Sequence, residues 1–325
     1  MKFSKTAPIL LSWLLLSAAF SVSAGEDSNA ITATPLTDYL TFFYAGREEP
    51  DAPPADDWVN GAAMRLGIGT YAIHQGDEAL VYDTFTTLKQ AQWVRAYLQK
   101  KGIVKITVVQ SHWHLDHVAG NEIYQDRTII SLDLTRDIML EKKAALEAGE
   151  EWGPPPIKPL IVPNVTFSDR LDLYVGDIKV ECHRFNIHTH DANLLYIPQD
   201  KIMLVGDTLE DPITYMVEPE GLRDHLQELQ RLRAMDIKVI YPNHGDPQTI
   251  VKGGYDKTFI DATVMYISGM LKRVHDKDFR QSKLEDYVGD ALASGWIHPW
   301  KPYREVHEMN LQVMQTYYVE KEAGH

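Results

Sequence analysis

The residues best suited to chemistry lie in one short segment, residues 111–121 of the 325-residue chain. Three imidazoles and a carboxylate occur within six residues there, contributed by His112, His114, Asp116 and His117. Imidazole nitrogen and carboxylate oxygen are the ligands that a divalent, zinc-like ion prefers. A polar loop with ordinary hydrogen-bonded histidines is the alternative, but this dense spacing favours a metal site.

The elements around this segment explain how a site could form. The cluster follows an apolar run, residues 106–109, that is typical of a buried strand, so we expect it in a turn at the strand's end rather than in a helix. Further ligand-type side chains adjoin other predicted strands, namely Asp83, His188, His190, Asp207 and His244. Any one of them alone would more often be a cap or a turn former. Because strand ends at one sheet edge converge in space, we expect these residues to join the cluster in one site.

The order of predicted elements indicates the fold class. Strands are predicted at residues 67–73, 79–82, 106–109, 128–131, 170–174, 178–185, 194–197, 202–205 and 237–241. Helices are predicted at residues 88–100, 133–150 and 221–234, and the chain beyond about residue 250 is helical throughout. Residues 25–60 hold few strand signals, and irregular chain is expected from about Trp152 to Phe167. This order favours packed sheets covered by helices, followed by a helical extension.

Composition limits the partners of the protein. The formal net charge of −14 argues against nucleic acid or an anionic membrane surface as a partner, since both require basic patches. A small-molecule substrate is therefore expected, whereas the composition does not indicate the oligomeric state. The single cysteine, Cys182, cannot form an intramolecular disulfide, and its parity with Ile178 and Val180 predicts a buried strand position.

Residues 1–24 have the pattern of a secretory signal peptide. Lys2 and Lys5 precede an apolar run at residues 9–20, and small residues at 22–24 form a cleavage site. The run is too short to span a membrane comfortably. We therefore expect a periplasmic or secreted protein with no membrane contact after cleavage. Its domains are predicted as a main domain over residues 25–250 and a helical extension over 251–325 that packs on it.

The ordered motifs resemble those of the metallo-β-lactamase superfamily over roughly residues 60–250. The resemblance implies an α/β fold, a four-layer αββα sandwich, here with a C-terminal helical extension. It also implies a dinuclear zinc centre with two Zn²⁺ ions per chain. The first ion would take His112, His114 and His188, and the second Asp116, His117 and His244. Asp207 would bridge both ions, and Asp83 would orient the metal loop.

Two positions refine the resemblance. The family's later histidine ligand usually precedes a small hydroxyl residue and stands ten residues before a proline that ends the next strand. His188 precedes Thr189 and stands ten residues before Pro198, so we assign His188 as the ligand and expect His190 behind the ligands or in the substrate groove. The aspartate at position 207 is similar to the residue of the glyoxalase II-like, lactonase-like and nuclease-like branches. Many dedicated zinc β-lactamases carry cysteine or serine at this position instead.

The implied chemistry is hydrolysis. Two dications that share a water lower its pKa, so that metal-bound hydroxide can attack an ester, lactone or amide carbonyl. Asp116 is the expected catalytic carboxylate, and Trp113 and Trp152 are expected to shape the groove, whereas Tyr215 is expected in the core. β-Lactam hydrolysis as a main or side activity is an alternative. A non-catalytic metal-binding protein is an alternative of another class. Glutathione thioesters fit an exported protein poorly, and nucleic acid fits an acidic one poorly.

Overall fold

The structure, a computed structural model, describes residues 30–47, 51 and 54–320. The predicted signal peptide, residues 1–24, lies outside the described residues. Within the described part of the chain, no helix combines the length and the apolar character needed to cross a membrane.

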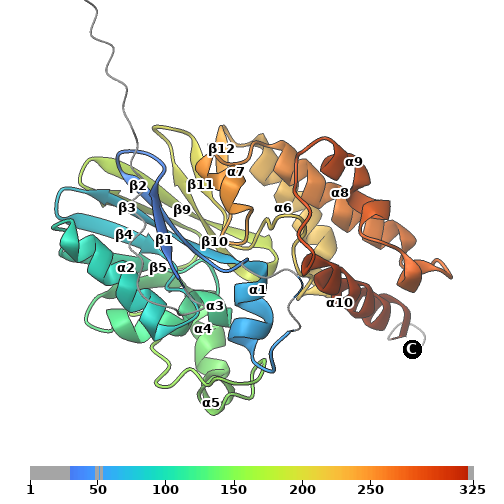
Figure 1. Ribbon diagram of the computed structural model, residues 1–325, viewed down its shortest axis with the longest axis horizontal. Helices are drawn as coiled ribbons and strands as arrows, with labels where there is room; N and C mark the ends of the chain where they lie inside the picture. Colours follow the sequence, from blue (N-terminus) through green and yellow to red (C-terminus); the bar gives the residue numbers. More distant parts are fainter. Residues whose placement is uncertain (1–29, 48–50, 52–53, 321–325) are drawn as a thin grey trace, which may run out of the picture.

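The first sheet carries the strand that leads into the metal-ligand segment (Figure 1). Adjacent strands of this sheet pair antiparallel from β1 to β4 and parallel from β4 to β7. The parallel pair β4 and β5 is joined through a helix, as parallel strands require. In spatial order the sheet contains β1 (Thr32–Pro35), β2 (Leu40–Ala45), β3 (Ile68–Gln75), β4 (Glu78–Tyr82), β5 (Lys105–Val109), β6 (Thr128–Leu132) and β7 (Val165–Phe167).

The second sheet supplies the later candidate ligands. Its spatial order is β12 (Val239–Tyr241), β11 (Ile202–Leu204), β10 (Thr189–Ile197), β9 (Ile178–Ile187) and β8 (Arg170–Val175). Burial alternates along β9, where Ile178, Val180 and Cys182 point into the core. Cys182 lies opposite Leu195 of β10, which confirms the prediction of a buried strand cysteine.

Helices cover the outer face of each sheet. The α-helices are α1 (Met64–Leu66), α2 (Leu88–Lys100), α3 (Leu115–Val118), α4 (Asp133–Glu141), α5 (Lys143–Ala148), α6 (Leu222–Ala234), α7 (Pro247–Val251), α8 (Thr258–Arg273), α9 (Glu285–Ala293) and α10 (Tyr303–Gln315). Short 3₁₀ or π turns are η1 (Val59–Ala63), η2 (Ala119–Tyr124), η3 (Pro219–Gly221), η4 (Phe279–Gln281) and η5 (Thr316–Glu320). From α2, Ala91, Val94 and Leu98 pack against the first sheet in one hydrophobic cluster.

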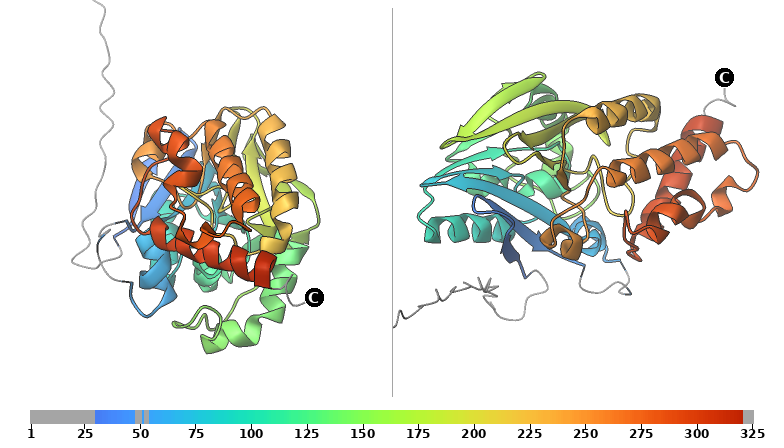
Figure 2. Two further views of the ribbon diagram at one scale, coloured as in Figure 1. Left: turned by 90° about the vertical axis from the view of Figure 1, so that its right-hand side faces the viewer. Right: turned by 90° about the horizontal axis from the view of Figure 1, so that it is seen from above.

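The αββα sandwich predicted from the family resemblance is confirmed by this arrangement. A second cluster joins the two sheets to the residues of α6 that face them, including Leu229 and Leu232. Viewed from above, the layers follow one another as helix, sheet, sheet and helix, with the C-terminal helices gathered at one end (Figure 2).

The C-terminal helices share the core of the sandwich. Leu194 of β10 and Ile240 of β12 belong to the same buried cluster as Tyr266 of α8 and Tyr303 and Met314 of α10. One continuous apolar core therefore connects the helical extension to the sheets that bear the candidate ligands.

Four local predictions were wrong. Residues 30–60 contain β1 and β2; every residue of β2 is buried, so no apolar–polar alternation marks this strand. The three-residue strand β7 lies where irregular chain was expected, and the helix predicted over 133–150 is interrupted at Lys142. The second half of the metal loop is helical rather than a turn, because Asp116 and His117 lie on α3.

Candidate metal centre

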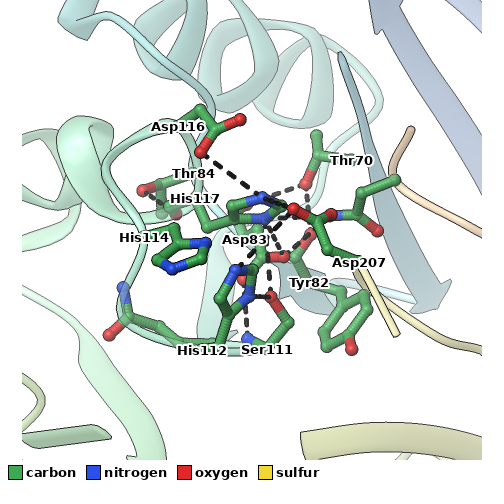
Figure 3. Close-up of polar contacts among 12 residues, drawn as sticks. Thr70, Tyr82, Asp83, Thr84, Ser111, His112, His114, Asp116, His117 and Asp207 are labelled. Carbon is green, nitrogen blue, oxygen red and sulfur yellow. Dashed lines mark hydrogen bonds and ion pairs between the residues drawn. The ribbon is translucent and has the colours of Figure 1, made fainter. Parts of the chain in front are cut away.

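Two buried groups of side chains could each hold a metal ion. The first contains His112, His114, His188 and Asp207, and the second contains Asp116, His117, His244 and Asp207. The potential ligand atoms of each group lie within 4.8 Å of one another. The seven residues assigned from the sequence are thus brought together, and Asp207 belongs to both groups. Figure 3 shows the part of the centre formed around the segment that follows β5.

In the first group, three imidazole rings surround the Asp207 carboxylate. His188 Nε2 lies 3.0 Å from His114 Nδ1, and the distances from Asp207 Oδ2 to Nε2 of His112 and of His188 are 3.7 and 3.9 Å. Nε2 of His112 and Oδ1 of Asp207 are buried and make no hydrogen bond within the described residues. Buried polar atoms rarely remain unpaired. A bound cation would satisfy them.

The second group is more tightly spaced. His117 Nε2 lies 3.0 Å from Asp207 Oδ2, and His244 Nε2 lies 3.0 Å from Asp116 Oδ2. The His244 ring is also 3.4 Å from Asp207 Oδ2, and His117 Nε2 is 3.6 Å from Asp116 Oδ1. Each ring nitrogen therefore points at a carboxylate oxygen, as ligands of one cation would.

The electrostatics of the two groups differ. Burial lowers the pKa of His112 and of His188, which favours the neutral imidazole that ligates a metal. Burial also opposes the charged form of His117, but the carboxylates of Asp207 and Asp116 outweigh it and raise the pKa of that ring. Two carboxylates in a buried site thus attract positive charge. Nitrogen and oxygen donors without a thiolate, in two groups that share one carboxylate, fit a pair of zinc ions.

Asp83 fixes the orientation of the His117 ring. Its Oδ2 accepts a hydrogen bond from His117 Nδ1 at 2.9 Å and another from Asn243 Nδ2 at 2.7 Å, while its Oδ1 accepts one from the Ser111 backbone N–H at 2.7 Å. The remaining nitrogen of His117, Nε2, is directed toward Asp207. A carboxylate behind a ligating imidazole sets its tautomer and raises its basicity.

Other rings are held by their Nδ1 atoms in the same way. His244 Nδ1 donates to the Gly67 carbonyl at 2.6 Å, and His188 Nδ1 donates to the Tyr215 carbonyl at 3.1 Å. His112 Nδ1 lies 2.9 Å from the Ser111 hydroxyl. Because Nδ1 is occupied, Nε2 is the atom that each of these rings presents to the centre.

Unusual backbone conformations place three of the residues. Asp83 and His188 have positive φ values of 70° and 68°, which cost roughly 1–3 kcal/mol each for residues other than glycine. Gly206, with φ of 56°, directly precedes Asp207, and a Cβ atom there would lie 2.9 Å from the Ser111 Cβ. Two of the strained residues thus lie at the candidate centre, and functional sites commonly store such strain.

The two groups open into a cavity of about 430 Å³. Sequence reasoning missed Glu210, which lines this cavity yet is only 3% exposed. Its carboxylate accepts hydrogen bonds from the Tyr303 hydroxyl at 2.9 Å and from the Tyr215 backbone N–H at 3.2 Å. Burial, reinforced by the charge of Asp207, raises the pKa of Glu210 to about 8. The position of this acidic residue three places after Asp207 was the available signal.

The aromatic residues at the cavity differ from expectation in two places. Trp152 is 44% exposed and lines the cavity, with its ring centroid 4.6 Å from that of His114. Trp113 is buried beneath Lys142 and is not among the lining residues, so its predicted role in the groove was wrong. Tyr215, which was expected in the core, lines the cavity instead.

His190 lies outside both ligand groups. Its half-exposed ring pairs with Glu218, with 2.7 Å between Nδ1 and Oε1, and its backbone N–H donates to the same carboxylate. The positive φ of His188 separates the directions of the two neighbouring histidines.

Comparison with known proteins places this site in a family. The family model described as the metallo-beta-lactamase superfamily matches residues 65–244, which contain every candidate ligand. The chain belongs to this superfamily. The superfamily is metal-dependent, and the two ligand groups of this chain supply residues that could bind such a metal.

Two curated relatives each match more than half of this chain. An atrochrysone carboxyl ACP thioesterase from Aspergillus fumigatus is 27% identical over 188 residues, which is 57% of this chain and 53% of the relative. A linear primary-alkylsulfatase from Pseudomonas sp. is 21% identical over 241 residues, which is 62% of this chain and 44% of the relative. The chain thus spans about half the length of the curated relatives it matches.

Solved structures of the superfamily share the fold. A metallo-beta-lactamase from Pontibacter korlensis matches with a TM-score of 0.56 at 19% identity, covering 73% of this chain and 99% of that one. The DIM-1 metallo-beta-lactamase matches with a TM-score of 0.56 at 17% identity, covering 75% and 99%. At such low identity, these similarities concern the fold alone.

Proposed function

We propose that this superfamily member is a dinuclear zinc hydrolase that cleaves a carbonyl ester, thioester or lactone. The observation that carries the proposal is that two ligand groups share Asp207 and border one cavity of about 430 Å³. Zinc bound there would lower the pKa of a water molecule toward neutrality and stabilise the negative charge that develops on the carbonyl oxygen.

The side chains at the site would bind the ions and position the attacking water. His112, His114 and His188 would hold one ion, while His117 and His244 join Asp116 on the other. Asp116 lies at the cavity wall, where a carboxylate oxygen can orient the attacking water and accept its proton. The apolar wall that includes Trp152 would contact the apolar part of a bound substrate.

The choice of a carbonyl substrate is supported by the relative of higher identity, which is named as a thioesterase. The second relative is named as a linear primary-alkylsulfatase, so sulfate esters are a competing substrate class. The structural likeness to metallo-beta-lactamases concerns the fold and does not by itself favour a β-lactam. The activity screen therefore compares carboxylic esters and thioesters, sulfate esters and β-lactams.

The screen uses the full zinc-loaded chain. Its substrates are p-nitrophenyl butanoate, a butanoyl thioester, a γ-lactone, a chromogenic cephalosporin and decyl sulfate. We expect turnover of at least one ester, thioester or lactone, abolished by EDTA and restored by zinc. Turnover confined to decyl sulfate or to the cephalosporin would contradict the proposed substrate class.

Asp116→Asn tests the catalytic carboxylate. The substitution keeps the shape of the side chain but removes a base, so kcat should fall by roughly two to four orders of magnitude. KM should change much less, because the lost interaction acts mainly in the transition state. Asp290→Asn, on the exposed surface of α9, is the matched control and should leave both constants unchanged. Zinc content is measured in each variant, since Asp116 is also a candidate ligand.

If zinc-replete Asp116→Asn keeps the wild-type kcat while His114→Ala is inactive, the metal centre acts without this carboxylate. That result would remove Asp116 from the role of base but leave it as a ligand.

A further inference from the structure

The cavity above the candidate ligands continues into a second hollow on the C-terminal side. The first cavity has apolar walls that include Trp58, Leu66, Trp152, Tyr215, Val306 and Met309. The second, of about 490 Å³, is lined by residues that include Tyr215, Val217, Pro219, Met309, Val313 and Tyr317. Tyr215 and Met309 belong to both linings, so the two hollows adjoin at these residues, and we refer to them together as the groove.

One side of this groove is a face of α10. Met309 and Val313 stand four residues apart on the helix, which places them in one row. Val306, one turn earlier, lines the metal end of the groove, so the row leads from the ligands outward. The other side of the groove is formed by the segment that begins at Tyr215 and contains Val217.

The apolar character of this face is not needed to fold the helix. An adjacent face of α10 buries Leu311 and Met314 in the core. Met309 nevertheless remains 45% exposed, and Trp152 at the other wall remains 44% exposed. In an acidic protein, exposed apolar side chains that flank a cleft indicate a surface that receives an apolar ligand.

The charges that line the groove indicate the chemical class of its ligand. Among the described residues that line either hollow, none is lysine or arginine, and Glu220 is the charged residue of the outer hollow. A phosphate-bearing or carboxylate-bearing tail would meet no cation there. An uncharged hydrocarbon chain would lose only its contact with water, at a gain of roughly 0.8 kcal/mol per fully buried methylene.

We propose that the outer groove, defined by Val217, Met309 and Val313 with Tyr215 at its entrance, binds an unbranched hydrocarbon chain of the substrate. The identity of the reacting carbonyl rests on the proposed function, whereas binding of the chain does not. The groove thereby selects substrates with a medium or long acyl chain over acetyl and butanoyl compounds.

Turnover of an ester series measures this selection. For p-nitrophenyl acetate, butanoate and octanoate, kcat/KM should rise by on the order of tenfold from butanoate to octanoate, because the groove covers the added methylenes only in part. Val313→Asp should lower the octanoate-to-acetate ratio of kcat/KM by a similar factor. Val104→Asp is the matched control, because Val104 is 52% exposed at the start of β5, outside both linings, and should preserve the ratio.

Binding without turnover gives the second readout. Calorimetric titration of the zinc-loaded chain should show decanoate binding at least about tenfold more tightly than butanoate. Val313→Asp should remove most of this preference. Val313→Thr, which keeps the side-chain shape, should reduce it and is the variant to use if Val313→Asp does not fold. Equal affinity for both anions, or the same preference in the Val313 and Val104 variants, would overturn the tail site. Failure of every ester to react would count against the proposed function, while a Val313-dependent decanoate preference would still support the groove.

Discussion

Asp207 is the single residue that both ligand groups require. Its Oδ2 atom lies between 3.0 and 3.9 Å from ring nitrogens of His117, His244, His112 and His188. Asp207→Ala should therefore bind at least one zinc equivalent fewer than the expected two per chain. Elemental analysis of dialysed protein measures this, and Asp290→Ala serves as the control. Full zinc content in Asp207→Ala would show that this carboxylate does not bridge.

His225 should make stability depend on pH. Its side chain is buried on α6, its Nε2 has no hydrogen bond within the described residues, and burial lowers its pKa to about 4. Since the unfolded chain protonates this imidazole near pH 6.5, the unfolded state binds the proton first as the pH falls. The contribution of neutral His225 is present above pH 6.5 and is lost progressively toward pH 4, by on the order of 3 kcal/mol.

His225→Leu tests this dependence. The variant cannot take up the proton, so its free energy of unfolding should fall less than that of the wild type between pH 7 and pH 4, by about 3 kcal/mol. Urea unfolding in the presence of EDTA measures both proteins without the pH dependence of metal binding. Parallel losses of stability in the two proteins would show that His225 is not protonated preferentially in the unfolded state.

Single residues were predictable when their evidence was local. The ligands beside β5 could be found because four of them are crowded into six positions, and His188 because of its distance from Pro198. Asp83 was expected from the family resemblance to orient the metal loop, but its partner Asn243 was not predictable, because the two residues are distant in sequence. Asn243 reaches Asp83 across 160 positions, and no periodicity or spacing records such a contact.

At the scale of elements, α10 contributes a polar contact to the cavity as well as an apolar wall. Tyr303, fully buried at its first turn, donates a hydrogen bond to Glu210 at 2.9 Å. Tyr303→Phe leaves that carboxyl short of one partner and should cost roughly 1–3 kcal/mol of unfolding free energy. Tyr174→Phe, at a position 65% exposed on β8, should cost almost nothing. Denaturant unfolding measures both, and equal stabilities would show that the Tyr303–Glu210 contact contributes nothing.

Elements were predictable where one periodicity ran long enough. The helix predicted over residues 88–100 coincides with α2, because its apolar stripe faces one sheet and its polar side faces solvent. β2 was missed because both of its faces are buried, and β7 because three residues are too few to show a pattern. The short helix α3 was missed because its metal-ligand spacing resembled a turn.

At the scale of the molecule, metal binding should contribute to stability. An ion that binds the folded chain but not the unfolded chain stabilises the folded state, and removal of the ions would remove this contribution. EDTA should therefore lower the melting temperature by on the order of 5 °C or more, and zinc should restore it. Scanning calorimetry measures this, with the Asp207→Ala variant expected to respond less. An unchanged melting temperature in the wild type would contradict tight binding.

The overall architecture followed from the order of motifs, and a packed C-terminal helical extension was expected, whereas the contact of that extension with the cavity was not. Alternating strands and helices up to β12 are sufficient to suggest a covered pair of sheets. The contact of α10 with the cavity depends on Tyr303 and Met309, which in the sequence look like ordinary residues of an amphipathic helix. Only the assembled core shows that this helix borders the site.

The two sheets contribute different ligands, and this division has a consequence for the order of folding. Asp116 and His244 are 128 positions apart, and His117 and Asp207 are 90 positions apart, so the closest pairs of the centre join distant parts of the chain. Contacts of such long sequence separation form late, because the loops between them must close first. Zinc uptake during refolding would then report the final docking of the two halves, after each sheet has acquired its own hydrogen bonds.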